Sequence, residues 1–340
     1  MSFGIGRRRV THNRTVARLP VAWTRQVTVA KIICGVDVSS DIQHARIGRD
    51  GASRKFDRGD EALDGFVAFC KDNRVELVVM EATGGYEKLL FARCWAAGLP
   101  AAIANPRAVR RFAEAMGFLE KTDAIDAGVI AWFAEVKAIV AQPPPDAVRQ
   151  QLKAAVLRLR QLTDMRVAEL NRKRLETDPD VLASIGTVLA LLARQIKEHE
   201  VRIAAAIDAD PLWALLNAEF RTIKGVAGRT VAGILALLPE IGVADNKAIA
   251  KLVGCAPIAH DSGKVQGKRA VRGGREAVRS LLFIVAEVVR RYDPRMAEFY
   301  RRLSEKGKAK KVIRVALVHK LLTWLNAKAR DIRNNFALAA

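Results

Sequence analysis

The chain has 340 residues, 50% of them hydrophobic, which is enough for two or three domains with apolar cores. Its apolar runs are interrupted by charge before the roughly 18 residues of a membrane span, and no apolar signal-peptide region follows the N-terminal arginines. The net charge of +21 predicts a polyanionic partner, most simply nucleic acid, with an unspecific basic surface as the alternative. The four cysteines show no paired spacing, so we expect buried thiols in a reducing cytoplasm rather than zinc or disulfides.

The first part of the chain alternates strand and helix signals after a basic arm at residues 1–28. Runs of apolar and β-branched residues predict strands at 27–38, 42–48, 53–57, 75–81 and 99–105. Helical patterns predict helices at 61–73, 89–98, 106–117 and 123–136. Three antiparallel strands followed by β-α-β-α order predict an RNase H-like α/β domain over residues 29–142.

A proline run within residues 142–146 marks a domain boundary. Residues 146–208 carry two long apolar stripes at helical spacing, separated at Asp178-Pro179, which predicts a helical hairpin in a coiled-coil form. An ordinary two-helix packing element is the alternative. Residues 211–335 predict a mostly helical, basic domain.

Four carboxylates are placed where phosphodiester chemistry needs them. Asp37 and Glu81 end predicted strands, and Asp123 and Asp126 stand three apart at the start of a predicted helix. Acids at the ends of buried strands are costly unless they are paired or bound to metal. Such a set could hold Mg²⁺ or Mn²⁺ ions that activate a nucleophile and stabilise a leaving oxygen. Each acid alone also suits a turn cap, an ion pair or a helix N-terminus, so the metal site is one of two interpretations.

Residues 220–242 predict two helical stretches around the sequence Gly-Val-Ala-Gly. This pattern resembles a helix-hairpin-helix, in which Gly225 and Gly228 would bring backbone N–H groups close to DNA phosphates. Such a contact positions nucleic acid without reading its sequence. A plain packing corner between two helices is the alternative.

Residues 255–283 are rich in glycine and basic residues. The candidate nucleic-acid contacts in this segment are Lys264, Lys268, Arg269, Arg272 and Arg275. Ser262 precedes a glycine in a predicted loop, and a hydroxyl among cations could attack a phosphodiester. His260 is a candidate base for that step. From the residues alone, a turn role for Ser262 is favoured over a nucleophilic one.

Six motifs together carry a resemblance to a known family. They are GVDVS, MEATGGYE, KTDAIDA, IKGVAG, GCAPIAHDSGKVQGKR and REAVRSLLF. As a set they resemble the DEDD transposases of the IS one-ten family of insertion sequences, bridge-RNA-guided recombinases, over roughly residues 30–335. The basic arm before Val27 departs from the family pattern.

The resemblance implies which residues carry the chemistry. It implies a RuvC-like N-terminal domain whose acid quartet falls on Asp37, Glu81, Asp123 and Asp126. It implies a C-terminal transposase domain whose serine nucleophile falls on Ser262 and forms a covalent phosphoserine link with DNA. The hairpin would then be a coiled-coil oligomerisation element.

The resemblance also implies partners. The acids of one protomer would serve the serine of another within a homo-oligomer, a dimer or tetramer. A structured bridge RNA would pair with donor and target double-stranded DNA, in the cytoplasm of a bacterium or archaeon and at its nucleoid. Two other functions stay open: a RuvC-type endonuclease that uses metal-activated water, and a nucleic-acid-binding protein without enzymatic activity. Only the recombinase needs Ser262.

Overall fold

The computed structural model of the chain describes residues 31–118, 123–259, 261–262, 267 and 269–339, without the side chains of residues 123–125 and 339. The chain divides into two compact units, Met1–Pro144 and Pro145–Ala340. The division falls inside the proline run. The predicted arm at residues 1–28 lies outside the described residues.

A mixed sheet organises the first unit, with strand order β3-β2-β1-β4-β5. The strands are β1 (Ile33–Val38), β2 (Ile42–Ile47), β3 (Ser53–Asp57), β4 (Leu77–Glu81) and β5 (Ala101–Ala104). β1, β4 and β5 are parallel, whereas β2 is antiparallel to both of its neighbours. The predicted strands and the antiparallel pairing of the first three are confirmed. The first strand is shorter than predicted, since it begins at Ile33.

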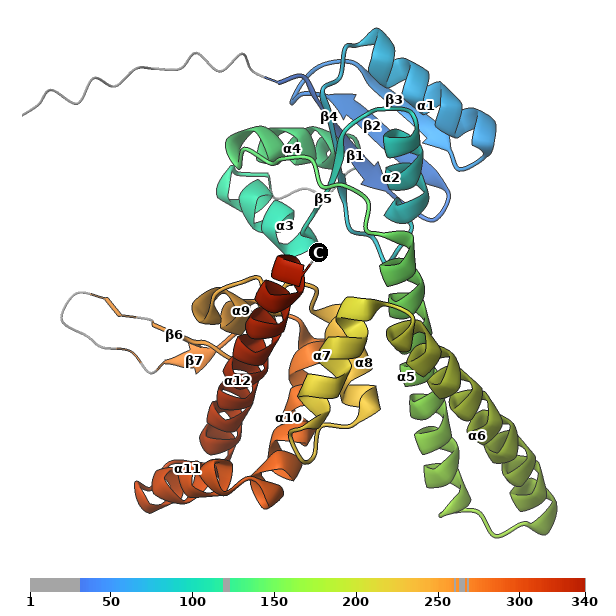
Figure 1. Cartoon of the computed structure of the whole chain (residues 1–340). Helices are drawn as coiled ribbons and strands as arrows, with labels where there is room; N and C mark the ends of the chain where they lie inside the picture. The colour runs from blue at the N-terminus through green and yellow to red at the C-terminus, as the bar shows by residue number, and fades with distance from the viewer. Residues whose placement is uncertain (1–30, 119–122, 260, 263–266, 268, 340) are drawn as a thin grey trace, which may run out of the picture. The chain divides into compact units, whose positions relative to one another are not determined.

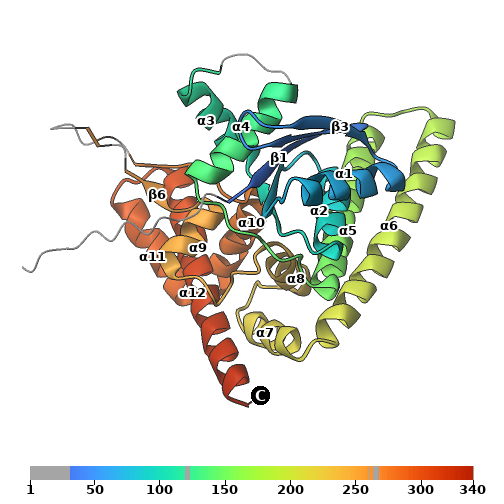
Figure 2. The same cartoon turned by 90° about the horizontal axis from the view of Figure 1, so that it is seen from above.

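Helices cover both faces of this sheet. They are α1 (Asp60–Asp72), α2 (Glu87–Ala96), α3 (Pro106–Ala115) and α4 (Asp123–Val136). Alternation along the strands sends Cys34, Val36 and Val38 into a core with α1 and α2. Ile33 belongs to the opposite core, which α3 and α4 complete. Figures 1 and 2 show the strands between these two helix pairs.

Helix α4 packs directly on β1 because Gly35 has no side chain. A Cβ atom at Gly35 would lie 2.1 Å from the carbonyl oxygen of Ala127 and 2.5 Å from the backbone nitrogen of Ala131. A similar approach occurs at Gly128, where a Cβ atom would lie 2.6 Å from the carbonyl oxygen of Arg49. The backbone of α4 therefore lies directly against the backbone of β1, with no side chain between them at Gly35.

The second unit begins with a long helical hairpin. Its arms are α5 (Ala147–Lys173) and α6 (Pro179–Asp208), which lie side by side in Figures 1 and 2. The side chain of Asp146 caps α5 and that of Asp178 caps α6, with Pro179 at the first position of α6. The two predicted helices and the break between them are confirmed, and their coiled-coil form stays a prediction.

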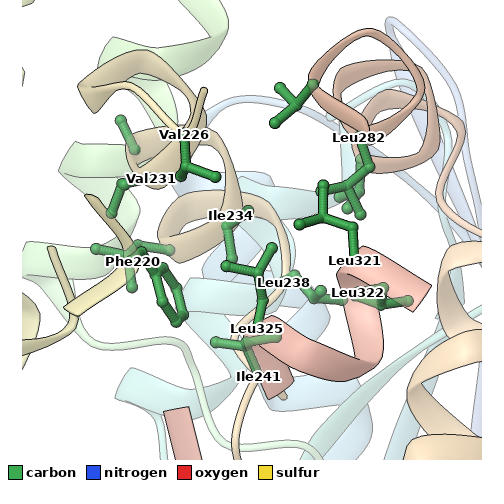
Figure 3. Close-up of a cluster of buried hydrophobic side chains, with 14 of the residues drawn as sticks. Phe220, Val226, Val231, Ile234, Leu238, Ile241, Leu282, Leu321, Leu322 and Leu325 are labelled. Carbon is green, nitrogen blue, oxygen red and sulfur yellow. The ribbon is translucent and has the colours of Figure 1, made fainter. Parts of the chain in front are cut away.

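The helices after the hairpin complete the second unit. They are α7 (Pro211–Arg221), α8 (Gly228–Leu237), α9 (Asn246–Val253), α10 (Glu276–Tyr292), α11 (Pro294–Glu305) and α12 (Lys310–Ala339). Their core includes Phe220, Leu238, Leu282 and Leu321, which converge from different helices in Figure 3. The two short strands β6 (Pro257–Ile258) and β7 (Ala270–Val271) were not predicted.

A buried asparagine joins α12 to the segment between α8 and α9. Asn326 is fully buried; its side chain accepts a 2.8 Å hydrogen bond from the Gly242 backbone and donates to the Ala244 carbonyl and the Asn246 side chain. Buried amides are tolerated only when their polar atoms are paired in this way. Asn326 thus supplies hydrogen-bond partners to backbone groups of the turn between α8 and α9, and it fixes that turn against α12.

The four cysteines are free and buried, as predicted. Burial raises the pKa of Cys94 to about 12 and that of Cys255 to about 11, so both remain thiols at neutral pH. Among the described residues, α6 is long and apolar enough to cross a membrane by length and composition alone, and 17% of its most apolar stretch is buried. Val181, Val188 and Leu191 are exposed on it.

Gly35→Ala tests the contact between α4 and β1. The added methyl group would collide with backbone atoms of α4, so we expect a loss of about 3 kcal/mol in the free energy of unfolding, measured by urea denaturation. Gly65→Ala is the matched control, since a Cβ atom there meets only the Phe56 ring at 3.9 Å inside α1. The control should be neutral or slightly stabilising. Equal stability of the two variants would contradict the packing argument.

Candidate active site

Asp37 and Glu81 stand at the same level on neighbouring strands. β1 and β4 are parallel and pair up to Val36 with Met80, and each acid is the next residue along its strand. Residues at one level of a parallel pair point to the same face. That face is the one covered by α4. Ile33 points to the same face as Asp37, and Leu77 to the same face as Glu81, and both apolar residues lie in the core with α4. Both acids are half-buried.

Helix α4 brings the other two acids toward this face. Asp126 is half-buried and precedes the buried Ile130 by four residues, so it lies on the side of α4 that faces the sheet. Asp123 is the first residue of α4, and its side chain lies outside the described residues. The structure thus brings Asp37, Glu81 and Asp126 to one face of the sheet.

The donor chemistry of these acids suits a hard divalent cation, because Mg²⁺ and Mn²⁺ prefer carboxylate oxygens. Across the described part of the chain, however, three or more histidine, cysteine, aspartate or glutamate side chains do not gather closely enough to hold a metal ion. The described geometry therefore supplies a shared face of carboxylates but not a complete set of ligands. The metal site stays a prediction.

His44 is a neighbour of the acids that the sequence analysis did not identify. It lies directly opposite Asp37 in the antiparallel pairing of β1 with β2, and it is buried. Its Nε2 atom is 2.8 Å from the hydroxyl of Ser53 on β3. The register between the first two predicted strands could have indicated this position, since residues opposite each other share a face.

The motif after β4 forms a tight turn held by a second glutamate. Glu87 is buried, and its carboxylate accepts hydrogen bonds from the backbone N–H groups of Thr83 (3.0 Å) and Gly85 (2.9 Å). Gly84 and Gly85 have φ values of +64° and +109°, which disfavour other residues. Glu87 therefore shapes the chain that leaves Glu81.

Ser262 lies on an arm that projects from the helices of the second unit. The arm leaves through β6 and returns through β7, and Figure 1 shows these two strands beside α9 and α12. We call this segment between α9 and α10 the serine arm. Ser262 is exposed. Its neighbour Asp261 accepts a 3.1 Å hydrogen bond from the Gly267 backbone and lies 3.9 Å from Arg269. The other predicted residues of this arm, His260, Lys264 and Lys268, lie outside the described residues.

The base of the serine arm is closed by backbone contacts. A Cβ atom at Gly254, the left-handed residue that ends α9, would lie 2.1 Å from the carbonyl oxygen of Gly273. A Cβ atom at Gly274 would lie 2.3 Å from the Gly254 nitrogen. The Arg275 N–H donates to the Leu252 carbonyl at 2.8 Å. The two ends of the arm are therefore locked together.

Arg275 reinforces this closure with its side chain. The guanidinium binds both carboxylate oxygens of Glu240 at 2.5 Å and donates to the Leu237 carbonyl at 3.1 Å. Burial is the strongest single influence and would raise the pKa of Glu240. The hydrogen bonds and charge of Arg275, a backbone hydrogen bond and the charge of Arg149 together outweigh it and leave the pKa below its usual range. Arg272, by contrast, is exposed. Arg275 as a nucleic-acid contact stays a prediction, although its guanidinium is already engaged.

The predicted helix-hairpin-helix corresponds to α7 and α8, and its assignment is not confirmed. Gly225 has φ of +103°, and a Cβ atom there would lie 3.1 Å from the Val289 nitrogen, so it packs on α10. Gly228 begins α8 and faces open space. That end of α8 borders a cavity of about 440 Å³ whose lining includes Arg221 and Arg229, and the carboxylates Glu200 and Asp208 as well.

The comparison with known families decides the identity of the chain. Residues 34–175 match the DEDD transposase family of IS110, and residues 217–301 match the transposase family IS116/IS110/IS902. The chain belongs to the IS110 family of transposases. This is the IS one-ten family that the sequence motifs resemble.

The IS110-family transposase is similar to several named proteins. Pilin gene-inverting proteins of Moraxella lacunata and Moraxella bovis are each 28% identical to it, over 75% of this chain and 80% of theirs. An insertion element IS110 protein of Streptomyces coelicolor is 28% identical over 44% of this chain and 37% of that protein. Together with the family, these relatives identify a DNA transposase or recombinase.

Among solved structures, the transposase is similar to T. thermophilus RuvC in complex with a Holliday junction substrate. The sequence identity is 13%, and the alignment covers 33% of this chain and 99% of RuvC with a TM-score of 0.25.

Glu240→Gln tests the closure of the serine arm. The variant leaves the Arg275 guanidinium without its charged partner, and we expect a loss of about 1–3 kcal/mol in the free energy of unfolding at neutral pH. Because the folded state lowers the pKa of Glu240, its contribution is present above the ordinary value of 4.5 and is lost as the pH falls below it.

The difference between wild type and variant in urea denaturation should therefore shrink as the pH is lowered below 4.5. Glu298→Gln, at an exposed position of α11, is the control and should leave stability unchanged at each pH. A constant difference across the pH range would contradict a role for the Glu240 charge.

Proposed function

We propose that this IS110-family transposase joins donor and target DNA through a covalent link to Ser262. The observation that carries the proposal is that the chain has two features together. A carboxylate face is built from Asp37, Glu81 and α4, and an exposed serine stands on an arm that is locked at its base. A metal-dependent nuclease that uses water needs only the first of these features.

In the proposed reaction, the Oγ atom of Ser262 attacks the scissile phosphorus. The Oγ–P bond forms as the bond from phosphorus to a deoxyribose oxygen breaks, and the serine proton passes to solvent. The leaving oxygen takes up a proton and becomes a hydroxyl group. In the second step a deoxyribose hydroxyl attacks the same phosphorus and releases Ser262, so that the number of phosphodiester bonds is conserved and DNA is rejoined.

The carboxylate face would hold the divalent metal of the reaction, Mg²⁺ or Mn²⁺, through Asp37, Glu81, Asp123 and Asp126. Bound there, the cation supplies Lewis-acid stabilisation of the charge that develops on the phosphate oxygens. The chain itself supplies the orientation of these ligands, because the strand register sets Asp37 beside Glu81. Arg269 and Arg272, which are exposed at the arm, would attract the DNA backbone.

Self-association is the second part of the proposal. The exposed apolar side chains of α6, including Val188 and Leu191, are suited to pair with a second copy through the hairpin. A dimer or tetramer would let the acids of one protomer serve Ser262 of another. Gly225 and Gly228 would support DNA binding as part of a helix-hairpin-helix.

The third part concerns sequence choice. We propose that a structured bridge RNA pairs with donor and target DNA, so the protein contacts backbones rather than base sequences. The net charge of +21 supports a chain that holds several nucleic-acid strands.

Ser262→Ala separates the recombinase from a water-using nuclease. Without the hydroxyl group, we expect no covalent protein–DNA adduct after denaturing electrophoresis and no strand exchange, while DNA binding is retained. Ser280→Ala, at an exposed position of α10, should form the adduct normally. Metal-dependent cutting that persists in Ser262→Ala would favour hydrolysis by water.

Asp37→Asn tests the metal site. Replacing a carboxylate with an amide weakens the ligand set, so we expect strand exchange to fall by about 100-fold or more and Mn²⁺ binding, measured by calorimetry, to weaken. Asp57→Asn is the matched control, because Asp57 also ends a strand but is exposed at the sheet edge. If both variants bind Mn²⁺ as wild type does, the carboxylate face is not a metal site.

A further inference from the structure

A hollow lies between the two arms of the helical hairpin. It has a volume of about 550 Å³. Its lining is Gln151, Ala154, Ala155, Arg158, His199 and Arg202. The α5 residues follow one helix face at spacings of three and four, and His199 and Arg202 do the same on α6. The two alanines leave room between longer side chains. We call this hollow the hairpin groove.

The hairpin groove is positively charged and has no acidic residue in its lining. Within the described residues, neither Arg158 nor Arg202 forms an ion pair. The neighbouring carboxylates are engaged elsewhere. The ion pairs of the hairpin are Arg160–Asp164, Arg172–Glu169, Arg194–Glu198 and Arg229–Glu200. The charge of the groove is therefore not neutralised by the described side chains.

The two arginines leave most of their hydrogen-bond donors available in the groove. Arg158 donates one hydrogen bond, to the Gln161 side chain at 3.3 Å, and both guanidinium groups are exposed. His199 also lines the groove, but its Nδ1 atom is buried and lies away from solvent. A group that accepts hydrogen bonds in the groove would therefore pair with the two guanidinium groups.

The required ligand is an anion with several acceptor oxygens. The guanidinium group of arginine matches the spacing of phosphate oxygens. Two guanidinium groups on facing helices can bind one phosphate, or neighbouring phosphates, from opposite sides. A polymer of phosphates fits the location better than a small metabolite, because Arg158 and Arg202 are exposed on a surface arm. Membership of a transposase family and the net charge of +21 favour nucleic acid as its source.

We propose that the hairpin groove binds the phosphate backbone of a nucleic acid. Arg158 and Arg202 hold the phosphate oxygens, and the exposed Gln151 completes the contact. The hairpin is then a nucleic-acid clamp as well as a candidate self-association element. This inference depends on the chain handling nucleic acid but not on the chemistry of Ser262.

The test compares two double variants of equal charge. Arg158→Gln/Arg202→Gln removes the groove arginines. Arg160→Gln/Arg194→Gln removes one arginine from each of the same two helices, at positions outside the groove. Both of these arginines already form an ion pair with an acid on their own helix. Binding of the full chain to a fluorescent duplex DNA and to a fluorescent single-stranded RNA is measured by anisotropy over a KCl titration.

For the groove variant we expect binding on the order of tenfold weaker in low salt. The slope of log affinity against log salt should also fall by about 2 for duplex DNA, or somewhat less for single-stranded RNA, since each lost phosphate contact contributes about one unit. The control variant should keep the slope of wild type. The probe whose slope changes identifies the strand that occupies the groove.

Three results would overturn the proposal. One is an equal loss in both variants, which would mean that only net charge matters. Another is an unchanged slope in the groove variant. The third is a changed oligomeric state of the groove variant in light scattering with unchanged nucleic-acid binding, which would place a second copy in the groove. Adduct formation at Ser262 is scored separately, so failure of the serine chemistry is distinguishable from failure of the groove.

Discussion

The contact of α4 with β1 at Gly35 is the constraint on which the carboxylate face depends. Two of the acids belong to the sheet and two to α4, so their separation is the distance between a strand and the helix packed on it. A glycine between Ile33 and Asp37 on the same face lets the backbone of Ala127 approach directly. A larger residue would push α4 outward and move Asp126 away from Asp37 and Glu81.

A second constraint of the same kind acts in the other unit. The approach of Gly254 to Gly273 and Gly274 closes the base of the serine arm, and the ion pair of Arg275 with Glu240 ties that base to the end of α8. In both units, close backbone contact at glycine does the positioning, while the polar residues that would carry chemistry lie just beyond it. The requirement for glycine at these positions is therefore steric.

Regular patterns made much of the fold predictable. Alternating and β-branched residues predict the strands that end at Asp37 and Glu81, and long apolar stripes predict both arms of the hairpin, because these signals repeat along the chain. Single contacts between distant residues leave no such signal. The position of His44 opposite Asp37, the capture of Arg275 by Glu240 and the short strands of the serine arm depend on tertiary neighbours. The proposed role of Ser262 rests on family resemblance, since a lone serine beside glycine is most often a turn residue.

Because the serine arm is closed at its base, the fold of the helices does not depend on the length of the arm. The chain leaves the helices at Ala256 and rejoins them near Gly274, and these two points are held together by contacts outside the arm itself. The entropy of closing a loop grows slowly, by about 0.6 kcal/mol for each doubling of its length. Changes in the length or sequence of the segment around the serine should therefore leave the helices beneath it in place.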